Sequence, residues 1–95
     1  MADPFPDTQR STRLKRLKMR AWRRGMKEMD LILGEFVDEH APSLSDEGLD
    51  SLERLMERPD QDLFLWMSGV RDAPADADPG EREVAARIMR QREER

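Results

Sequence analysis

Cysteine is absent from the 95-residue sequence, and histidine occurs once, as His40. Without cysteine there can be no disulfide framework and no thiolate metal site. Zinc needs several His or Cys ligands, and a serine nucleophile needs a base beside it, so a single histidine serves neither well. The acidic runs lack the spacing of a calcium loop, and no glycine-rich phosphate loop is present. We therefore predict that the chain is not an enzyme and binds no metal.

Long apolar runs are also missing. No uninterrupted stretch approaches the roughly 20 residues that cross a bilayer. Residues 1–10 contain Asp3, Asp7, Pro4 and Pro6 but no apolar segment, and they fit neither a secretory signal nor an acid-poor transit peptide. We expect residues 1–10 to form a disordered N-terminal arm of a cytoplasmic bacterial protein that does not bind membranes.

Charge is divided unevenly along the chain. Residues 1–27 hold nine Lys/Arg against two Asp, a net charge of +7, whereas residues 28–95 hold eight Arg against nineteen Asp/Glu, a net charge of -11. A basic segment of this kind favours an anionic partner. Because the acidic remainder would repel a long polyanion, the partner is expected to be a compact acidic protein surface.

Little in the sequence indicates β-structure, because Val, Ile, Thr and Tyr are scarce and no segment alternates with period two. Apolar residues instead recur at helical spacing between Pro, Gly and Ser breaks. The predicted fold is all-α, a small five-helix bundle in a single domain over residues 11–91. The predicted helices span 11–22, 26–40, 46–58, 61–69 and 79–91, and residues 92–95 are expected to fray.

Residues that favour helix ends set these boundaries. Ser45, Asp60 and Asp78 are predicted N-caps, and Asp78 has Glu81 three residues later, as a capping box requires. Gly69 is placed to take a left-handed conformation after the fourth helix. His40 is expected at a helix C-terminus, where it would interact with the dipole.

The predicted core faces are built largely from Leu and Met, which fill space adaptably but specify packing loosely. We therefore expect modest stability. The predicted core residues are Leu14, Leu17, Ala21, Met26, Met29, Ile32, Leu33, Phe36, Val37, Leu49, Leu52, Leu55, Met56, Leu63, Phe64, Met67, Val70, Val84, Ala85, Ile88 and Met89.

A cluster at the junction of the first two helices departs from local helix rules. It comprises Arg20, Arg23, Arg24, Gly25, Lys27, Glu28 and Asp30. Cations near a helix N-terminus oppose the macrodipole, and glycine lowers helix propensity. One interpretation is a solvated basic face with a glycine that turns the chain. The other is that Gly25 allows a partner's backbone to approach closely, while Arg24 and Glu28 offer it a donor and an acceptor.

The two tryptophans are weighed in the same way. Trp66 lies in a short amphipathic helix and is predicted to be in the core. Trp22 stands beside the basic cluster, and the sequence leaves open whether it is a core residue or an exposed partner anchor.

Two segments together resemble the FAD assembly factors of succinate dehydrogenase. Arg24-Gly25-Met26-Lys27-Glu28, followed by Asp30 and Phe36, resembles the family's Arg-Gly-x-x-Glu signature, and residues 59–69 resemble its second recurring block. Both occur in family order and at family-like separation. Met19 is a departure, because many relatives have an aromatic residue there.

The resemblance implies a five-helix factor that promotes covalent attachment of FAD to the flavoprotein subunit of succinate dehydrogenase and, in some bacteria, of fumarate reductase. In that family the bond joins a flavin methyl carbon to a histidine of the client. We accordingly expect no stably bound FAD and a monomeric factor. The expected partner-binding residues are Arg20, Trp22, Arg23, Arg24, Gly25, Glu28 and Asp30.

Two other classes of function are considered. The first is a nucleic-acid-binding module that uses the basic first helix, although no helix carries Asn, Gln or Arg at groove-reading spacing. The second is a helix that binds acidic membranes, which would need a larger apolar face than Leu14, Leu17 and Ala21 provide.

Overall fold

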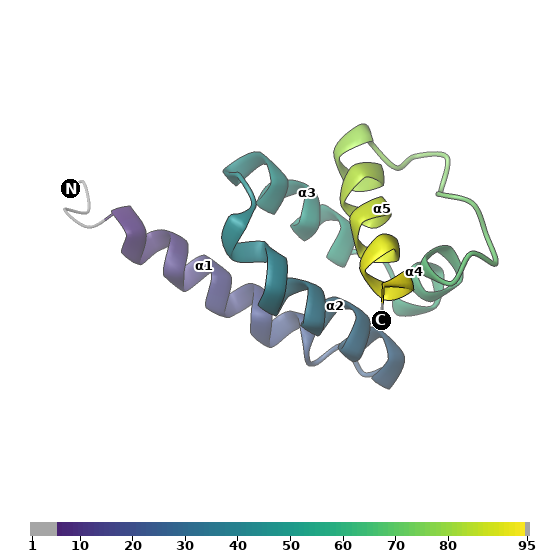
Figure 1. Ribbon diagram of the computed structural model, residues 1–95, viewed down its shortest axis with the longest axis horizontal. Helices are drawn as coiled ribbons and strands as arrows, with labels where there is room; N and C mark the ends of the chain where they lie inside the picture. The colour runs from purple at the N-terminus through teal and green to yellow at the C-terminus, as the bar shows by residue number, and fades with distance from the viewer. Residues whose placement is uncertain (1–5, 95) are drawn as a thin grey trace.

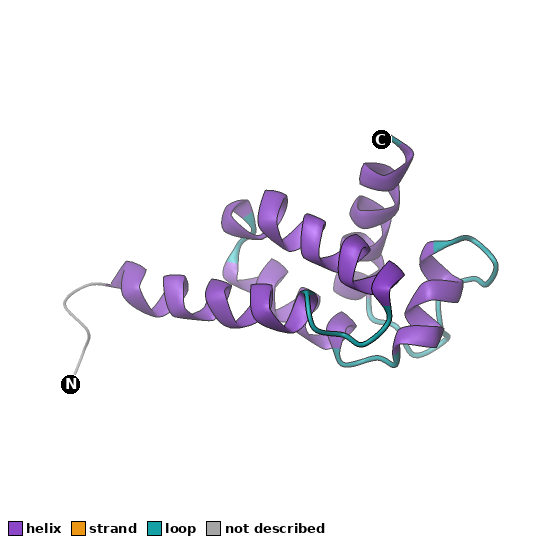
Figure 2. Cartoon of the chain, turned by 90° about the horizontal axis from the view of Figure 1, so that it is seen from below, coloured by secondary structure: helices purple, strands orange, loops and turns teal. Residues whose placement is uncertain are grey.

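The computed structural model describes residues 6–94 and contains five α-helices in that range (Figure 1). They are α1 (Pro6–Ala21), α2 (Lys27–His40), α3 (Asp46–Met56), α4 (Asp60–Met67) and α5 (Pro79–Glu93), and a short 3-10 turn, η1 (Ala41–Ser43), follows α2. No strand occurs in the described residues (Figure 2). The predicted all-α, five-helix fold is confirmed.

The largest difference from the predicted boundaries is at the N-terminus. The first helix begins at Pro6, so residues 6–10 are helical and do not belong to a disordered arm. Proline favours the first position of a helix, because its fixed φ suits the helix and its missing N–H would have no partner there. Residues 1–5, the rest of the predicted arm, lie outside the described residues. At the other end α5 continues to Glu93, past the predicted fraying point.

The helices pack around α2, which contacts α1, α4 and α5, while α3 packs against α5. In Figure 1, α1 and α2 lie side by side and α1 extends beyond the rest of the fold. Leu and Met supply ten of the nineteen buried apolar residues in the described part of the chain, so they are the main core residues, as predicted. The largest fully buried residues are Phe36, Leu17, Met29, Leu33, Leu49, Leu52, Leu55, Leu63 and Ile88.

Most of the predicted helix ends are correct in their atomic detail. The Ser45 hydroxyl accepts a hydrogen bond from the Gly48 N–H at 3.0 Å, and Asp78 and Glu81 form the complete capping box. Gly69 has a φ of +82°, which is the predicted left-handed conformation. The prediction for Asp60 was wrong: Pro59 occupies the N-cap position, and the Asp60 carboxylate is bound elsewhere.

One predicted core residue is misplaced. The side chain of Val70 is 70% exposed, because α4 ends at Met67 and the chain leaves the core before Val70. Five others, Leu14, Met26, Ile32, Phe64 and Met89, are partly buried against the core. Trp66 is buried, as predicted.

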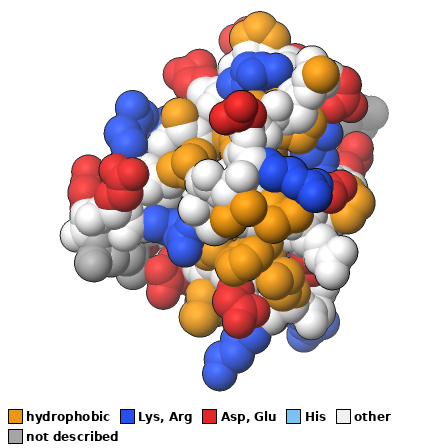
Figure 3. Space-filling view, turned by 90° about the vertical axis from the view of Figure 1, so that its right-hand side faces the viewer, with side chains coloured by type: hydrophobic (Ala, Val, Ile, Leu, Met, Phe, Trp, Pro, Cys, Tyr) orange, Lys and Arg blue, Asp and Glu red, His pale blue; other side chains and the backbone are white. Residues whose placement is uncertain are grey.

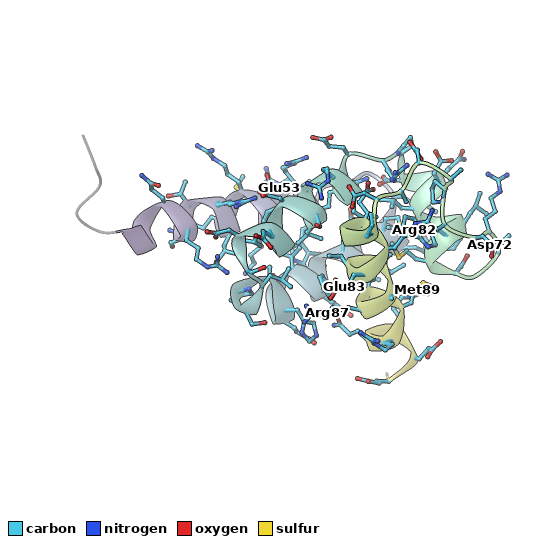
Figure 4. All side chains as sticks on the ribbon, turned by 90° about the horizontal axis from the view of Figure 1, so that it is seen from above. Glu53, Asp72, Arg82, Glu83, Arg87 and Met89 are labelled. Atoms are coloured by element: carbon cyan, nitrogen blue, oxygen red, sulfur yellow. The ribbon has the colours of Figure 1, made fainter. Side chains whose placement is uncertain are left out.

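Ion pairs connect α1 to α3. Arg10 lies 2.9 Å from Asp46, and Arg13 binds Asp50 and Glu53, which joins α1 to α3. Glu53 is visible on α3 in Figure 4. Burial lowers the pKa of Arg13, but its hydrogen bonds to these two carboxylates outweigh that effect and raise the pKa above the usual value. Part of the basic charge near the N-terminus is thus neutralised within the molecule.

No helix among the described residues is both long and apolar enough to span a membrane. In the same part of the chain, His, Asp and Glu side chains do not come together in any group of three or more that could hold a metal ion.

Candidate docking site at the junction of the first two helices

Residues 22–26 form a tight turn between α1 and α2, and Gly25 gives this turn its shape. Gly25 has a φ of +94°, a conformation that residues with a side chain rarely adopt. A Cβ built at Gly25 would meet no atom within 4 Å. Gly25 therefore turns the chain, and it also presents a bare Cα on an open surface, so the two interpretations made from the sequence are compatible.

Arg24 points inward from this turn. Its Nε donates to Asp60 Oδ1 at 2.6 Å and its Nη2 donates to the Arg58 carbonyl at 2.7 Å, while Nη1 donates to the Met56 carbonyl. Only 12% of the Arg24 side chain is exposed. The guanidinium is thus bound to the end of α3 and the start of α4, and it does not pair with Glu28.

Asp30 and Glu28 lie in the first turn of α2 but differ in their surroundings. Asp30 Oδ1 accepts a hydrogen bond from the Arg24 backbone N–H at 2.6 Å, which fixes the turn to the helix that follows. Glu28 is exposed. Both carboxylates stand near the positive end of the α2 dipole, which stabilises them there. Of the two, Glu28 is the one available to a partner.

Arg20 and Arg23 are exposed on the outer side of the turn. Together with Met19, they surround a hollow of about 510 Å³ whose remaining lining comes from Arg24 and Asp60. Among side chains of residues 9–94, neither Arg20 nor Arg23 has an ion-pair partner within 4.0 Å. Met19 is 52% exposed, so the hollow combines an apolar contact with two available cations.

Trp22, which the sequence left open, is half-buried against α2. A Cβ added at Gly34 would overlap the six-membered ring of the indole, so the ring lies directly on this glycine. The indole Nε1 donates to Asp38 Oδ2 at 3.3 Å. Trp22 therefore packs α1 against α2.

A second hollow of about 310 Å³ begins at Glu28 and runs between α2, α4 and α5. Its apolar lining comes from Leu31, Ile32, Phe64 and Ile88, and Leu31 is 44% exposed. In Figure 3, which views the molecule from the right-hand side of Figure 1, hydrophobic side chains gather near the middle of the face between charged ones. The exposed surface next to the turn therefore has a basic part and an apolar part.

The seven residues predicted from the sequence lie at or beside one turn. Three residues that line the two hollows next to this turn were not predicted as part of the site. Asp60 was interpreted as a helix cap, Met19 as a departure from the family pattern, and Leu31 was not singled out. A signal existed for Leu31, because it lies three residues after Glu28 and so shares its helix face. The partnership of Arg24 with Asp60 spans 36 residues and has no local signal.

Comparison with known sequences settles the family. Residues 15–92 match the family described as "Flavinator of succinate dehydrogenase". The chain belongs to this flavinator family. The match includes the last part of α1, the whole turn, and α2 to α5 except the final residue of α5, so the candidate site falls within it.

Individual relatives agree with the family match. The chain is 45% identical over 67 residues to the FAD assembly factor SdhE of Pseudomonas aeruginosa, which covers 70% of this chain and 77% of that protein. It is 38% identical over 64 residues to SdhE of Acetobacter pasteurianus, covering 67% of this chain and 59% of the relative. Identity to succinate dehydrogenase assembly factor 2, a mitochondrial protein of Meyerozyma guilliermondii, is 40% over 57 residues, or 60% of this chain and 42% of that protein.

The chain thus spans only about two fifths to three fifths of the yeast and Acetobacter relatives. No solved structure gives a significant match.

Proposed function

We propose that this chain is an assembly factor without catalytic groups of its own, which binds the flavoprotein subunit of succinate dehydrogenase and promotes covalent attachment of FAD to that subunit. The observation that carries the proposal is the family match over residues 15–92, which includes the turn with the bare Gly25. The names of the bacterial relatives describe FAD assembly factors. Fumarate reductase is a second client of the same kind.

The surface around the turn has features that suit docking on a protein. Gly25 offers an open backbone, and Arg20 and Arg23 offer cations that are available to acidic groups of the client. Arg is typical of interface hot spots, and Met, like the exposed Met19, is enriched at protein interfaces. Glu28, three residues after Gly25, adds an exposed acceptor, so the surface near the bare backbone carries both charge types.

Such a factor can act without forming any bond itself. If it binds only the conformer of the client in which FAD and the acceptor histidine are aligned, it raises the population of that conformer by its differential affinity. Alignment of two reacting groups can supply a large part of a rate enhancement. FAD stays with the client throughout, and the factor acts as a monomer.

The test compares two glycines with matched geometry. Gly25 and Gly69 both have a positive φ, +94° and +82°, and a Cβ at either would meet nothing within 4 Å. Gly25→Arg and Gly69→Arg therefore impose similar backbone strain, of order 1–2 kcal/mol, on different surfaces. In cells without the wild-type factor, covalent flavin on the client is measured by in-gel fluorescence.

The expected result is that Gly25→Arg abolishes client flavinylation and Gly69→Arg preserves it, while both purified variants melt at similar temperatures. Equal loss in both variants would assign the effect to backbone strain. Normal flavinylation with Gly25→Arg would show that Gly25 serves only to turn the chain.

A further inference from the structure

Arg24 is surrounded by other parts of the protein, whereas a side chain that docks on a partner is usually exposed. Its guanidinium donates to three acceptors, one carboxylate and two carbonyls, whereas Arg20 and Arg23 are exposed. A client carboxylate that approached Arg24 would have to compete with Asp60, which lies 2.6 Å from Nε. Arginine binds carboxylates best through a planar fork of two N–H groups, and here this fork is directed into the protein.

The acceptors of Arg24 lie at the ends of two helices. Met56 is the last residue of α3, and the carbonyls of a final helical turn lack partners within the helix. Asp60 is the first residue of α4, and Arg58 lies between the two helices. A cation at this place satisfies the carbonyls and complements the negative end of the α3 dipole. Arg24 therefore holds the connection between α3 and α4 against the turn.

The same residue also fixes the turn on its other side. The Arg24 backbone N–H donates to Asp30, and Gly25 follows immediately with its positive φ. Glycine has more accessible conformations than any other residue, so its neighbours must supply the restraint that keeps Gly25 in one of them. Arg24 is bound through its side chain to one end of the fold and through its backbone to α2.

We propose that Arg24 is a positioning residue: it does not contact the client, and through its bond to Asp60 and the carbonyls at the end of α3 it holds Gly25 and Glu28 in the arrangement that the client recognises. This inference rests on the proposed function for the identity of the client. It divides the cluster into residues that hold the turn, Arg24 and Asp30, and residues that meet the client. Asp60 is then necessary for docking, although it lies on α4, 36 residues from Arg24 in the sequence, and is not itself expected to contact the client.

The test begins with Asp60→Ala, which removes the acceptor and leaves Arg24 in place. Its matched control is Asp62→Ala, because Asp62 is an exposed carboxylate in the same first turn of α4. Affinity for the isolated flavoprotein subunit is measured by calorimetry well below the melting temperature of every variant. We expect Asp60→Ala to weaken binding on the order of ten- to a hundredfold, the range for loss of one hydrogen bond to a charged group. Asp62→Ala should leave the affinity unchanged.

Two further variants separate positioning from direct contact. Arg24→Met should lose as much affinity as Asp60→Ala, and the double variant should lose no more than either, because both act through one connection. Arg24→Lys keeps the charge but cannot reach three acceptors in a plane, so it should not restore binding. Direct contact predicts the opposite: Asp60→Ala would preserve or improve affinity by releasing the guanidinium, and Arg24→Lys would retain most of it.

Hydrogen exchange of the free factor tests the connection without any client. Asp60→Ala should speed amide exchange in residues 24–28, and Asp62→Ala should not. Unchanged exchange would overturn the positioning role of Arg24. Faster exchange in Asp60→Ala, together with a wild-type factor that neither binds nor flavinylates the subunit, would leave the connection intact and refute the proposed function instead.

Discussion

The indole of Trp22 lies against the backbone of Gly34, and no other residue type could occupy position 34 without moving the ring. Gly34→Ala would normally stabilise a helix by about 1 kcal/mol. Here the added methyl overlaps the indole, and overpacking typically costs about 1–3 kcal/mol. We therefore expect Gly34→Ala to be destabilising in urea unfolding, and the double variant Trp22→Leu/Gly34→Ala to be less destabilised than the two single changes added together. Strict additivity would contradict this contact.

Glu81 and Asp76 both bind Arg58, but they differ in burial. Arg58 Nε lies 2.7 Å from Glu81, whose side chain is 7% exposed, while Asp76 is 81% exposed. The hydrogen bond to Glu81 outweighs burial and raises the pKa of Arg58. We expect Glu81→Gln to cost about 1–3 kcal/mol, because it weakens a buried charge-assisted bond, and Asp76→Asn to cost less than about 1 kcal/mol. Chemical denaturation measures both, and equal costs would show that burial does not matter here.

Asp78 gives the fold a dependence on acid. Its carboxylate accepts the Glu81 backbone N–H and binds Arg54, and these bonds hold the pKa of Asp78 below its usual value. Because the folded state favours the charged form, the contribution is complete above about pH 4, the pKa of an unfolded aspartate, and is lost as the pH falls further. Asp78→Asn keeps a capping side chain but removes the charge.

The wild type should therefore be more stable than Asp78→Asn at pH 7, and the gap should narrow by about pH 3. Urea unfolding at the two pH values measures the gap. A gap of constant size would mean that the charge of Asp78 contributes nothing.

Arg10 and Arg13 are bound to α3, which leaves a smaller basic surface than the sequence alone indicates. Titration with duplex DNA at ~0.15 M salt should therefore show no binding tighter than the non-specific range, roughly 10⁻⁴ to 10⁻⁶ M. Fluorescence anisotropy with two unrelated duplexes is sufficient. Nanomolar binding that distinguishes the duplexes would favour a nucleic-acid function instead.

The parts of this fold that local rules control could be predicted from the sequence. Ser45 and Asp78 fix helix starts through bonds to residues three positions away, and Gly69 ends α4 for reasons of backbone geometry. Pro6 carried a helix-start signal that the prediction did not use.

What could not be predicted depends on distant partners. Arg24 was expected to face a partner, but Met56, Arg58 and Asp60 bind it across more than 30 residues, and nothing near Arg24 in the sequence announces them. The position of Trp22 likewise depends on which α2 residue lacks a side chain. The predicted residues lie together at one turn, while the direction in which each side chain points required the packed structure.

The two long-range anchors of the turn also determine how the chain can vary in length. Trp22 packs on Gly34, and Arg24 is bound by Asp30 and Asp60. A residue inserted between positions 22 and 26 would therefore break at least one of these contacts. The loop of residues 68–78 is held mainly near its C-terminal end, where Arg82 donates to the carbonyls of Pro74 and Ala77. Asp72 lies at the far end of this loop from α5, away from those bonds (Figure 4). A fluorescent label or an affinity tag placed beside Asp72 would thus leave the turn intact, whereas one extra residue beside Gly25 would remove it.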